Sequence, residues 1–211
     1  MSLQFNRKII TIITLLLVLS SANIYSQNFD IDLLRKINLN RNRNLDNTFR
    51  VITNSVRPAQ IGVPIILYGL SLTTKDSVMR RNFFYVGASI LTTMAVTTIL
   101  KVSINRPRPF VTYPDIEKET DVGSHSFPSG HTSDAFALAT SVSLAYPKWY
   151  VIVPLYLWAG SVGYSRMHLG VHYPSDVLAG AVIGAGSAYL CYKGQQWLSK
   201  KYKIKVHKNN L

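Results

Sequence analysis

Long stretches of the chain carry almost no charge and are separated by short polar loops. Most of them fall a little short of the roughly 20 apolar residues that cross a bilayer, a mismatch that polar ends and neighbouring helices can absorb. The pattern predicts an all-α fold, a bundle of about five or six helices that crosses a membrane. A compact soluble α bundle is the alternative. The stretches are residues 59–74, 82–100, 135–146, 149–165 and 177–192.

Small residues are frequent in the last stretch, where Gly180, Gly184, Gly186 and Ala188 recur at short intervals. Side chains of this size let helices approach closely, as bundles in membranes favour. We therefore expect this helix to pack tightly against a neighbour.

Residues 1–26 have the layout of a secretory signal, because two basic residues precede an apolar run from Ile9 to about Leu19 and small residues follow. Extension of that run to Tyr25 gives nearly the length of a span. This segment is therefore either a cleaved signal peptide or a first transmembrane helix.

Residues 27–57 form a basic segment with apolar positions at helical spacing. Such a segment either lies on a membrane surface or packs on the domain as a solvated helix. We assign residues 58–197 to the helical domain and residues 198–211 to a basic tail.

The composition of the chain limits the classes of ligand and partner that it can bind. The 211 residues suffice for one domain, and 23 Lys and Arg against 10 Asp and Glu give a formal net charge of +13. This charge is scattered over both predicted faces and the tail, without a nucleic-acid-binding motif, so we expect no nucleic-acid partner. The single cysteine, Cys191, excludes a disulfide framework and any thiolate metal site built from this chain alone.

The first of three polar clusters follows the second apolar stretch. It consists of Lys101 and the run Asn105-Arg106-Pro107-Arg108-Pro109. The prolines stiffen the backbone, and the Arg108 guanidinium presents a fork that matches phosphate oxygens. Such cations can converge on an anion, although basic residues beside an apolar helix also serve as interfacial anchors.

The second cluster, Phe127-Pro128-Ser129-Gly130-His131, directly precedes the third stretch. A Pro-Ser-Gly sequence at a helix start leaves backbone N–H groups available, and glycine lets an anion approach them. His131 then lies in the first turn, beside the bound anion.

The third cluster combines Ser165-Arg166 with His172 and Asp176. Pro174 and Ser175 mark a helix start, which places Asp176 in the first turn with its carboxylate directed back toward His172. A carboxylate that fixes the imidazole tautomer leaves the other ring nitrogen free to attack or to exchange a proton.

Together the three clusters resemble, position for position, the tripartite signature of the type 2 phosphatidic acid phosphatase superfamily. The motifs cover Lys101 to Asp176, and the helix layout from about residue 58 to 195 is also similar to that of the family. Its members include membrane lipid phosphatases, soluble acid phosphatases and vanadium haloperoxidases.

The resemblance implies a mechanism. His172 attacks phosphorus and forms a phosphohistidine, Asp176 orients it, and His131 protonates the leaving oxygen. Three fixed cations take the place of magnesium, so we expect neither a metal nor another cofactor. The phosphoryl oxygens are held by Lys101, Arg108, Arg166 and the backbone of Ser129 and Gly130.

Two other histidines, His125 and His168, match no signature position, and we expect them to be structural. The acidic loop, Asp115 to Asp121, would repel a phosphate substrate. We interpret it as a solvated outer face or a lid.

The sequence therefore predicts a metal-independent phosphatase that acts on a phospholipid, polyprenyl or lipid A phosphate or pyrophosphate. We expect it in the bacterial inner membrane with its site toward the periplasm and without a protein partner. The short loops with Arg80, Arg81 and Lys148 would then face the cytoplasm. The alternatives are a secreted soluble acid phosphatase, periplasmic after signal cleavage, and a vanadium haloperoxidase.

Overall fold

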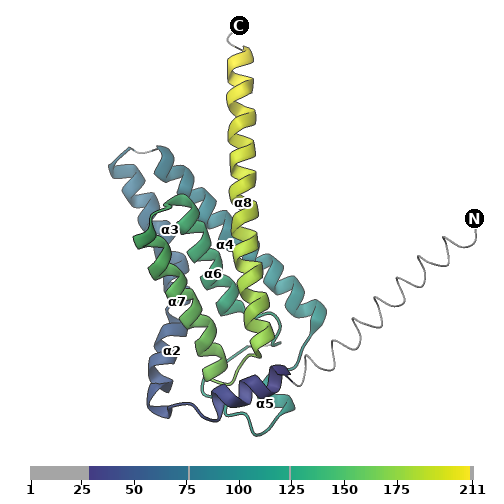
Figure 1. Ribbon diagram of the computed structural model, residues 1–211. Coiled ribbons are helices and arrows are strands. Elements are labelled where there is room, and N and C mark those ends of the chain that lie inside the picture. Colours follow the sequence, from purple (N-terminus) through teal and green to yellow (C-terminus); the bar gives the residue numbers. More distant parts are fainter. Residues whose placement is uncertain (1–28, 76, 124, 210–211) are drawn as a thin grey trace, which may run out of the picture.

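The computed structural model describes residues 29–75, 77–123 and 125–209, which form helices and no strands (Figure 1). Five long helices make up the bundle, and each coincides with one of the apolar stretches. The predicted all-α bundle is thus confirmed. The long helices are α3 (Val56–Thr73), α4 (Ser77–Ile104), α6 (Gly130–Ala145), α7 (Trp149–His168) and α8 (Pro174–Asn209).

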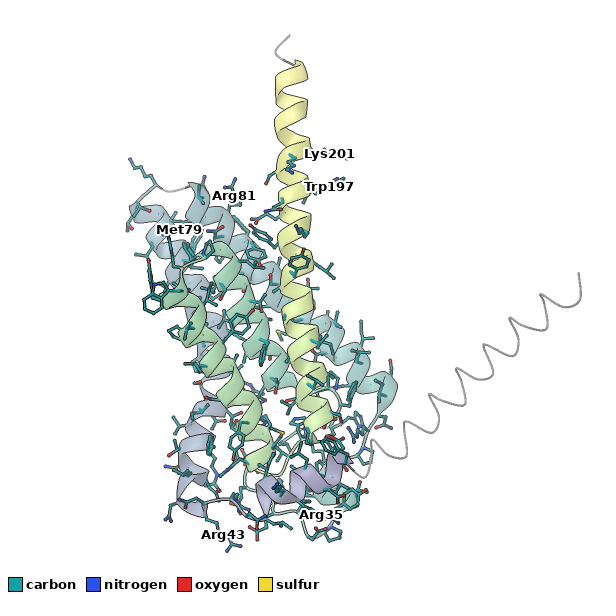
Figure 2. All side chains as sticks on the ribbon, viewed as in Figure 1. Arg35, Arg43, Met79, Arg81, Trp197 and Lys201 are labelled. Atoms are coloured by element: carbon teal, nitrogen blue, oxygen red, sulfur yellow. The ribbon has the colours of Figure 1, made fainter. Side chains whose placement is uncertain are left out.

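Shorter elements gather at one end of the bundle, where α4 and α7 end and α6 and α8 begin (Figure 1). This end holds all three polar clusters. Figure 2 shows Met79, Arg81, Trp197 and Lys201 toward the other end, away from Arg35 and Arg43. The shorter elements are the helical residues 29–38, the 3-10 helix η1 (Arg43–Leu45), α2 (Asp46–Asn54) and α5 (Pro109–Thr112).

Helix α6 lies at the centre of the bundle and packs on α3, α4, α7 and α8. Its approach to α8 requires glycine, because a Cβ at Gly184 would lie 2.1 Å from the Ser133 carbonyl oxygen and one at Gly180 would lie 2.7 Å from that of Ser129. The predicted close approach is confirmed at these two positions. Gly186, in contrast, faces open space.

The outer faces of the long helices are apolar and exposed. A surface of this extent is unusual for a monomer in water. By length and composition alone, one segment of the described chain, Val78–Thr112, is apolar enough to cross a membrane. Helix α6 is largely covered by protein, and its buried residues are mostly small or hydroxylated. Exposed examples are Ile61, Ile65, Ile66, Leu91, Ile99, Leu157, Leu178, Val182 and Leu190.

The helical residues 29–38 pack on the domain. Ile31 and Leu34 are buried in a small core with Ile116 and Tyr173. The segment 1–26, which we assigned to a signal or a first span, lies outside the described residues. Helix α8 continues through residue 209 and so includes most of the residues that we set apart as a tail.

The acidic loop forms ion pairs with the basic segment. Arg41 is nearly inaccessible and contacts both Glu117 and Glu119, at 2.8 and 3.2 Å. The Asn38 side chain donates to the Glu117 and His168 carbonyl groups at 3.0 and 2.9 Å. Most acids of this loop are therefore neutralised locally. Further pairs are Arg35–Asp115, Arg43–Glu117 and Arg50–Glu119.

Candidate active site

His172 lies in the short loop between α7 and α8, with its two ring nitrogens in different environments. Nδ1 is 3.3 Å from Oδ2 of Asp176, and Nε2 is 3.3 Å from Nη1 of Arg108. A guanidinium only donates, so Nε2 must be the unprotonated nitrogen and Nδ1 must carry the hydrogen. The lone pair of Nε2 is therefore presented on the Arg108 side of the ring.

The loop that carries His172 is held by its backbone. Gly170 has a φ of +70°, and a Cβ there would lie 2.1 Å from the Glu117 carbonyl oxygen, so only glycine fits this turn. The Val171 carbonyl accepts a 2.8 Å hydrogen bond from Arg108. These backbone contacts hold the loop in place. None of them involves Nε2 of His172.

Asp176 is fully buried behind His172, in the first turn of α8. Its carboxylate accepts from Ser126 Oγ, from the Tyr173 amide at 3.0 Å and from Arg106 Nη1 at 2.8 Å. With this many donors it remains an ionised acceptor for the His172 N–H.

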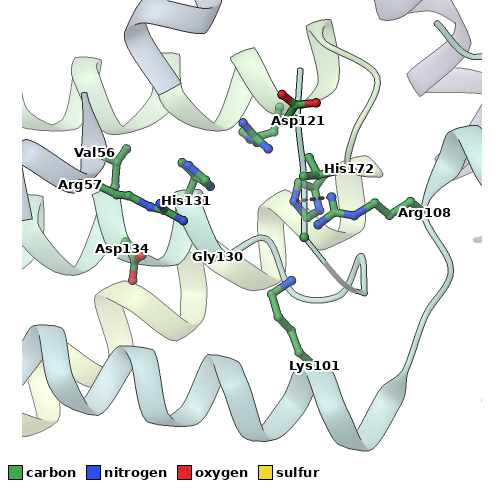
Figure 3. A pocket seen from close by; sticks show the side chains of 12 residues that line it. Val56, Arg57, Lys101, Arg108, Asp121, Gly130, His131, Asp134 and His172 are labelled. Atoms are coloured by element: carbon green, nitrogen blue, oxygen red, sulfur yellow. Dashed lines mark hydrogen bonds between the residues drawn. The ribbon is translucent and has the colours of Figure 1, made fainter. Parts of the chain in front are cut away.

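A cavity of about 260 Å³ opens in front of His172 (Figure 3). Four cationic side chains reach it from four different elements. Six residues that we predicted for the site line it together: Lys101, Arg108, Gly130, His131, Arg166 and His172. The other lining residues are Val56, Arg57, Asp121, Val122, Gly123 and Asp134.

The signature cations are held by neutral partners. Lys101 Nζ donates to the His125 carbonyl at 2.8 Å, and Arg166 Nη1 donates to Thr53 Oγ1 at 2.8 Å. Nε of Arg166 is buried without a hydrogen-bond partner among the described residues. An unsatisfied buried donor costs about 1–3 kcal/mol, more when charged, which an anion in the cavity would recover.

Ser129 departs from our expectation. Its backbone N–H donates to the Asp176 carbonyl at 3.0 Å, and its hydroxyl pairs with Thr132. Its amide is thus engaged in joining α6 to α8, and Ser129 does not line the cavity. The close packing at Gly180 brings the starts of α6 and α8 together, so the Ser129 N–H donates to α8 and is not available to a phosphate. Gly130, the next residue, does face the cavity.

Family comparison decides the identity. The model of the PAP2 superfamily matches residues 82–200, more than half of the chain and all three clusters. The chain belongs to the PAP2 superfamily. The resemblance seen in the sequence is thus confirmed.

Individual PAP2 relatives align over different shares of the chain. A lipid A 4′-phosphatase from Bacteroides thetaiotaomicron is 39% identical over 70 residues, which is 33% of this chain and 31% of that protein. An undecaprenyl-diphosphatase from Sulfolobus acidocaldarius is 30% identical over 166 residues, 77% and 76% of the two chains. This chain therefore spans less than a third of the first relative.

A solved PAP2 structure has the same fold. The crystal structure of a transmembrane PAP2 type phosphatidylglycerolphosphate phosphatase from Bacillus subtilis superimposes with a TM-score of 0.68. The alignment covers 89% of this chain and 95% of the other, at 24% identity. The likeness establishes the helical arrangement.

His125 and His168, which match no position of the PAP2 signature, do not line the cavity. His168 is buried, and its Nε2 lies 2.8 Å from Oδ1 of Asp46. Burial raises the pKa of Asp46, but hydrogen bonds from Arg41 and His168 outweigh it and leave the pKa below its usual value. The pair ties α7 to α2. His125 supplies the backbone carbonyl that holds Lys101.

Burial is the main influence on the titration of His172, and it lowers the pKa of the imidazole to about 3. The neighbouring cations Arg166 and Arg108 act in the same direction, while Asp176 opposes them. His172 therefore stays neutral at physiological pH, the state that a nitrogen nucleophile needs.

Sequence reasoning missed three contributors. Arg57 lines the cavity, although a single arginine before an apolar stretch has the pattern of an interfacial anchor. Asp134 lies one turn after His131, and its only signal was an acid directly before the apolar stretch 135–146. Arg106 belongs to the first cluster, but we assigned it no role. Among the described residues, no group of three His, Cys, Asp or Glu side chains is placed to hold a metal ion.

Proposed function

We propose that this PAP2 protein is a phosphatase that hydrolyses a phosphate or pyrophosphate monoester of a membrane lipid through a phosphohistidine. One observation carries the proposal: Nε2 of His172 faces the Arg108 guanidinium at the edge of a cationic cavity, and Asp176 lies within hydrogen-bond distance of Nδ1 behind the ring. Nucleophile, orienting group and anion-binding cations are the parts that phosphoryl transfer requires.

The reaction proceeds in two displacements. In the first, a bond forms between Nε2 of His172 and phosphorus while the bond from phosphorus to the leaving oxygen breaks. His131 gives its proton to that oxygen. In the second, a water oxygen attacks phosphorus, His131 takes a proton from the water, and the bond to Nε2 breaks to release inorganic phosphate.

The cations supply the electrostatic stabilisation. The guanidinium of Arg108 lies beside Nε2, where the attacked phosphoryl group must sit, and the unsatisfied Nε of Arg166 is a donor for one of its oxygens. Lys101 and the Gly130 turn complete the lining. Fixed cations of this kind offset the charge that the transition state spreads over the phosphoryl oxygens.

A lipid substrate follows from the surface of the bundle. The exposed apolar faces of α3, α4, α7 and α8 suit hydrocarbon, and they disfavour the soluble acid phosphatase alternative. The site lies at one end of these helices, at the depth of lipid headgroups. We place the protein in the bacterial inner membrane with the site toward the periplasm. Its substrate is a phospholipid, polyprenyl or lipid A phosphate.

The test is phosphate release from phosphatidate and farnesyl diphosphate by the purified protein in detergent micelles. Turnover should persist in excess EDTA, and vanadate should compete with substrate because its five-coordinate form resembles the transition state. Quenching during turnover of a ³²P-labelled substrate should trap an acid-labile phosphoenzyme.

Two variants sharpen the test. His172→Asn should form no phosphoenzyme, whereas His207→Ala, which removes a histidine outside the signature, should behave as the wild type. Thermal melting shows whether each variant is folded. A trappable phosphohistidine in His172→Asn, or activity that EDTA abolishes and magnesium restores, would contradict the proposal.

A further inference from the structure

Arg57 is held in the cavity wall by the junction of α2 and α3. It is the second residue of α3 and follows Val56, which is buried in a core formed with α6 and α7. The Ser55 hydroxyl accepts a 2.9 Å hydrogen bond from Trp158, and Thr53 accepts from Arg166. The backbone before Arg57 is therefore fixed on both sides, and from this point the exposed side chain of Arg57 reaches the cavity.

The cavity has two sides. In Figure 3, Lys101, Arg108 and His172 lie together on one side, while Arg57, His131 and Asp134 lie on the other. Arg57 and His131 both line this cavity and lie on the same side of it in Figure 3. Arg57 is thus a fourth cation, placed beside the proton donor and away from the nucleophile.

Helix stability does not account for this position. A cation in the first turn of a helix opposes the helix dipole, which favours anions there. No carboxylate among the described residues lies within 4.0 Å of the Arg57 guanidinium. Asp134 lines the same side of the cavity as Arg57.

The direction of attack decides what Arg57 meets. Displacement at phosphorus is in line, so the leaving oxygen points away from Nε2 of His172 and toward His131. Whatever group is attached to that oxygen extends to the side of Arg57. A cation there matches a leaving group that is itself an anion.

We propose that Arg57 binds the lipid-proximal phosphate of a lipid diphosphate and makes such diphosphates the preferred substrate class of this site. The inference rests on the proposed phosphatase function. The bond from Nε2 of His172 to the terminal phosphorus forms as the bond from that phosphorus to the bridging oxygen breaks. The bridging oxygen keeps the electron pair and takes the proton of His131. A lipid monophosphate leaves with its charge offset by Arg57.

A matched pair of substrates tests this assignment. Farnesyl diphosphate and farnesyl monophosphate share one lipid and differ only in the phosphate that Arg57 would bind. Both are assayed with the full chain in detergent micelles. Arg57→Ala should lower kcat/KM for the diphosphate by about 10- to 100-fold, the scale of one charge-assisted hydrogen bond. The loss for the monophosphate should stay below about 3-fold, because that substrate has no second phosphate.

Two further variants serve as controls. Arg57→Lys keeps the charge and should recover most of the diphosphate activity. Arg80→Ala removes an exposed arginine at the other end of the bundle and should leave kcat/KM unchanged for both substrates. Thermal melting identifies a misfolded variant, in which case Arg57→Gln, with a side chain closer in size, takes the place of alanine.

The outcomes separate the two proposals. Equal losses for both substrates in Arg57→Ala would place Arg57 on the transferred phosphoryl group and overturn the inference. So would an unchanged diphosphate activity, or a wild-type protein that hydrolyses the monophosphate alone. A wild-type protein that hydrolyses no lipid phosphate and forms no phosphoenzyme would instead overturn the proposed function.

Discussion

Arg106 donates a 2.8 Å hydrogen bond to Asp176, so the carboxylate that orients the nucleophile is itself held by a cation. The same guanidinium donates to Asp30 at 2.8 Å and lies 3.8 Å from the centre of the Tyr173 ring. Asp30 in turn accepts from the Ser175 amide. A residue of the N-terminal helical segment thereby supports the first turn of α8.

This arrangement predicts a positioning role for Arg106. Arg106→Ala should lower kcat by about 10- to 100-fold with little change in KM, because misorientation of His172 affects the transition state more than substrate binding. Arg106→Lys should restore part of kcat, and Asp30→Asn should cost less than Arg106→Ala. Steady-state kinetics at controlled ionic strength measure the effects on kcat and KM separately. A raised KM at unchanged kcat would assign Arg106 to substrate binding instead.

His131 should matter in proportion to the basicity of the leaving group. On an alkyl phosphate such as phosphatidate, His131→Ala should cost about 10²–10⁴-fold in kcat/KM, the usual scale of general acid catalysis. On p-nitrophenyl phosphate, whose leaving group departs readily without a proton, the loss should be distinctly smaller. Equal losses on both substrates would show that His131 is not the proton donor.

The buried imidazole of His172 should make folding stability dependent on pH. Its pKa is lowered to about 3 in the folded protein, while an unfolded histidine titrates near 6.5. Between these values the unfolded state binds the proton and the folded state does not, so stability falls as the pH falls through this window.

The matching measurement compares melting temperatures. From about pH 7 to about pH 4.5 the wild type should lose more Tm than His172→Asn, which has no such group. Titrating groups that do not contact His172 are common to both proteins and cancel in the comparison. An identical pH dependence would mean that His172 is protonated in the folded protein.

Topology can be tested with single cysteines in a Cys191→Ser background. Lys148 lies in the turn between α6 and α7, at the opposite end from the site, and Lys118 is an exposed residue of the acidic loop. In intact cells, Lys118→Cys should react with a membrane-impermeant maleimide, while Lys148→Cys should react only after lysis. The reverse pattern would invert our orientation, and labelling at both positions would favour a soluble protein.

The sequence anticipated the parts of the site that depend on local spacing. Asp176 reaches His172 because α8 starts at Pro174, between them, and its first turn places the Asp176 carboxylate beside the loop that carries His172. The bundle followed from apolar stretches whose ends carry the polar clusters. Helices that alternate in direction bring Lys101, His131 and His172 to one end, so their convergence was also predictable.

Contacts between distant segments were not predictable in this way. Arg57 and Arg106 acquire their roles from residues far away in the chain, and nothing in their immediate sequence distinguishes them from interfacial anchors. The amide of Ser129 is consumed because Gly180 lets α8 approach α6, a fact of packing that no motif encodes. The acidic loop likewise depends on arginines about 70 to 80 residues earlier.

The length of helix α8 can be compared with the thickness of a bilayer. Asp176 is in its first turn, and Lys201 lies 5.0 Å from the ring of Trp197, the aromatic–cation combination that settles at a headgroup boundary. At about 1.5 Å per residue, the helix between Asp176 and Lys201 measures roughly 38 Å, slightly more than the hydrocarbon thickness of about 30 Å. With the membrane placement that we propose, anchoring at that far boundary would hold His172 level with the opposite headgroups. The depth of a lipid's phosphate would then select substrates before any side chain contacts them.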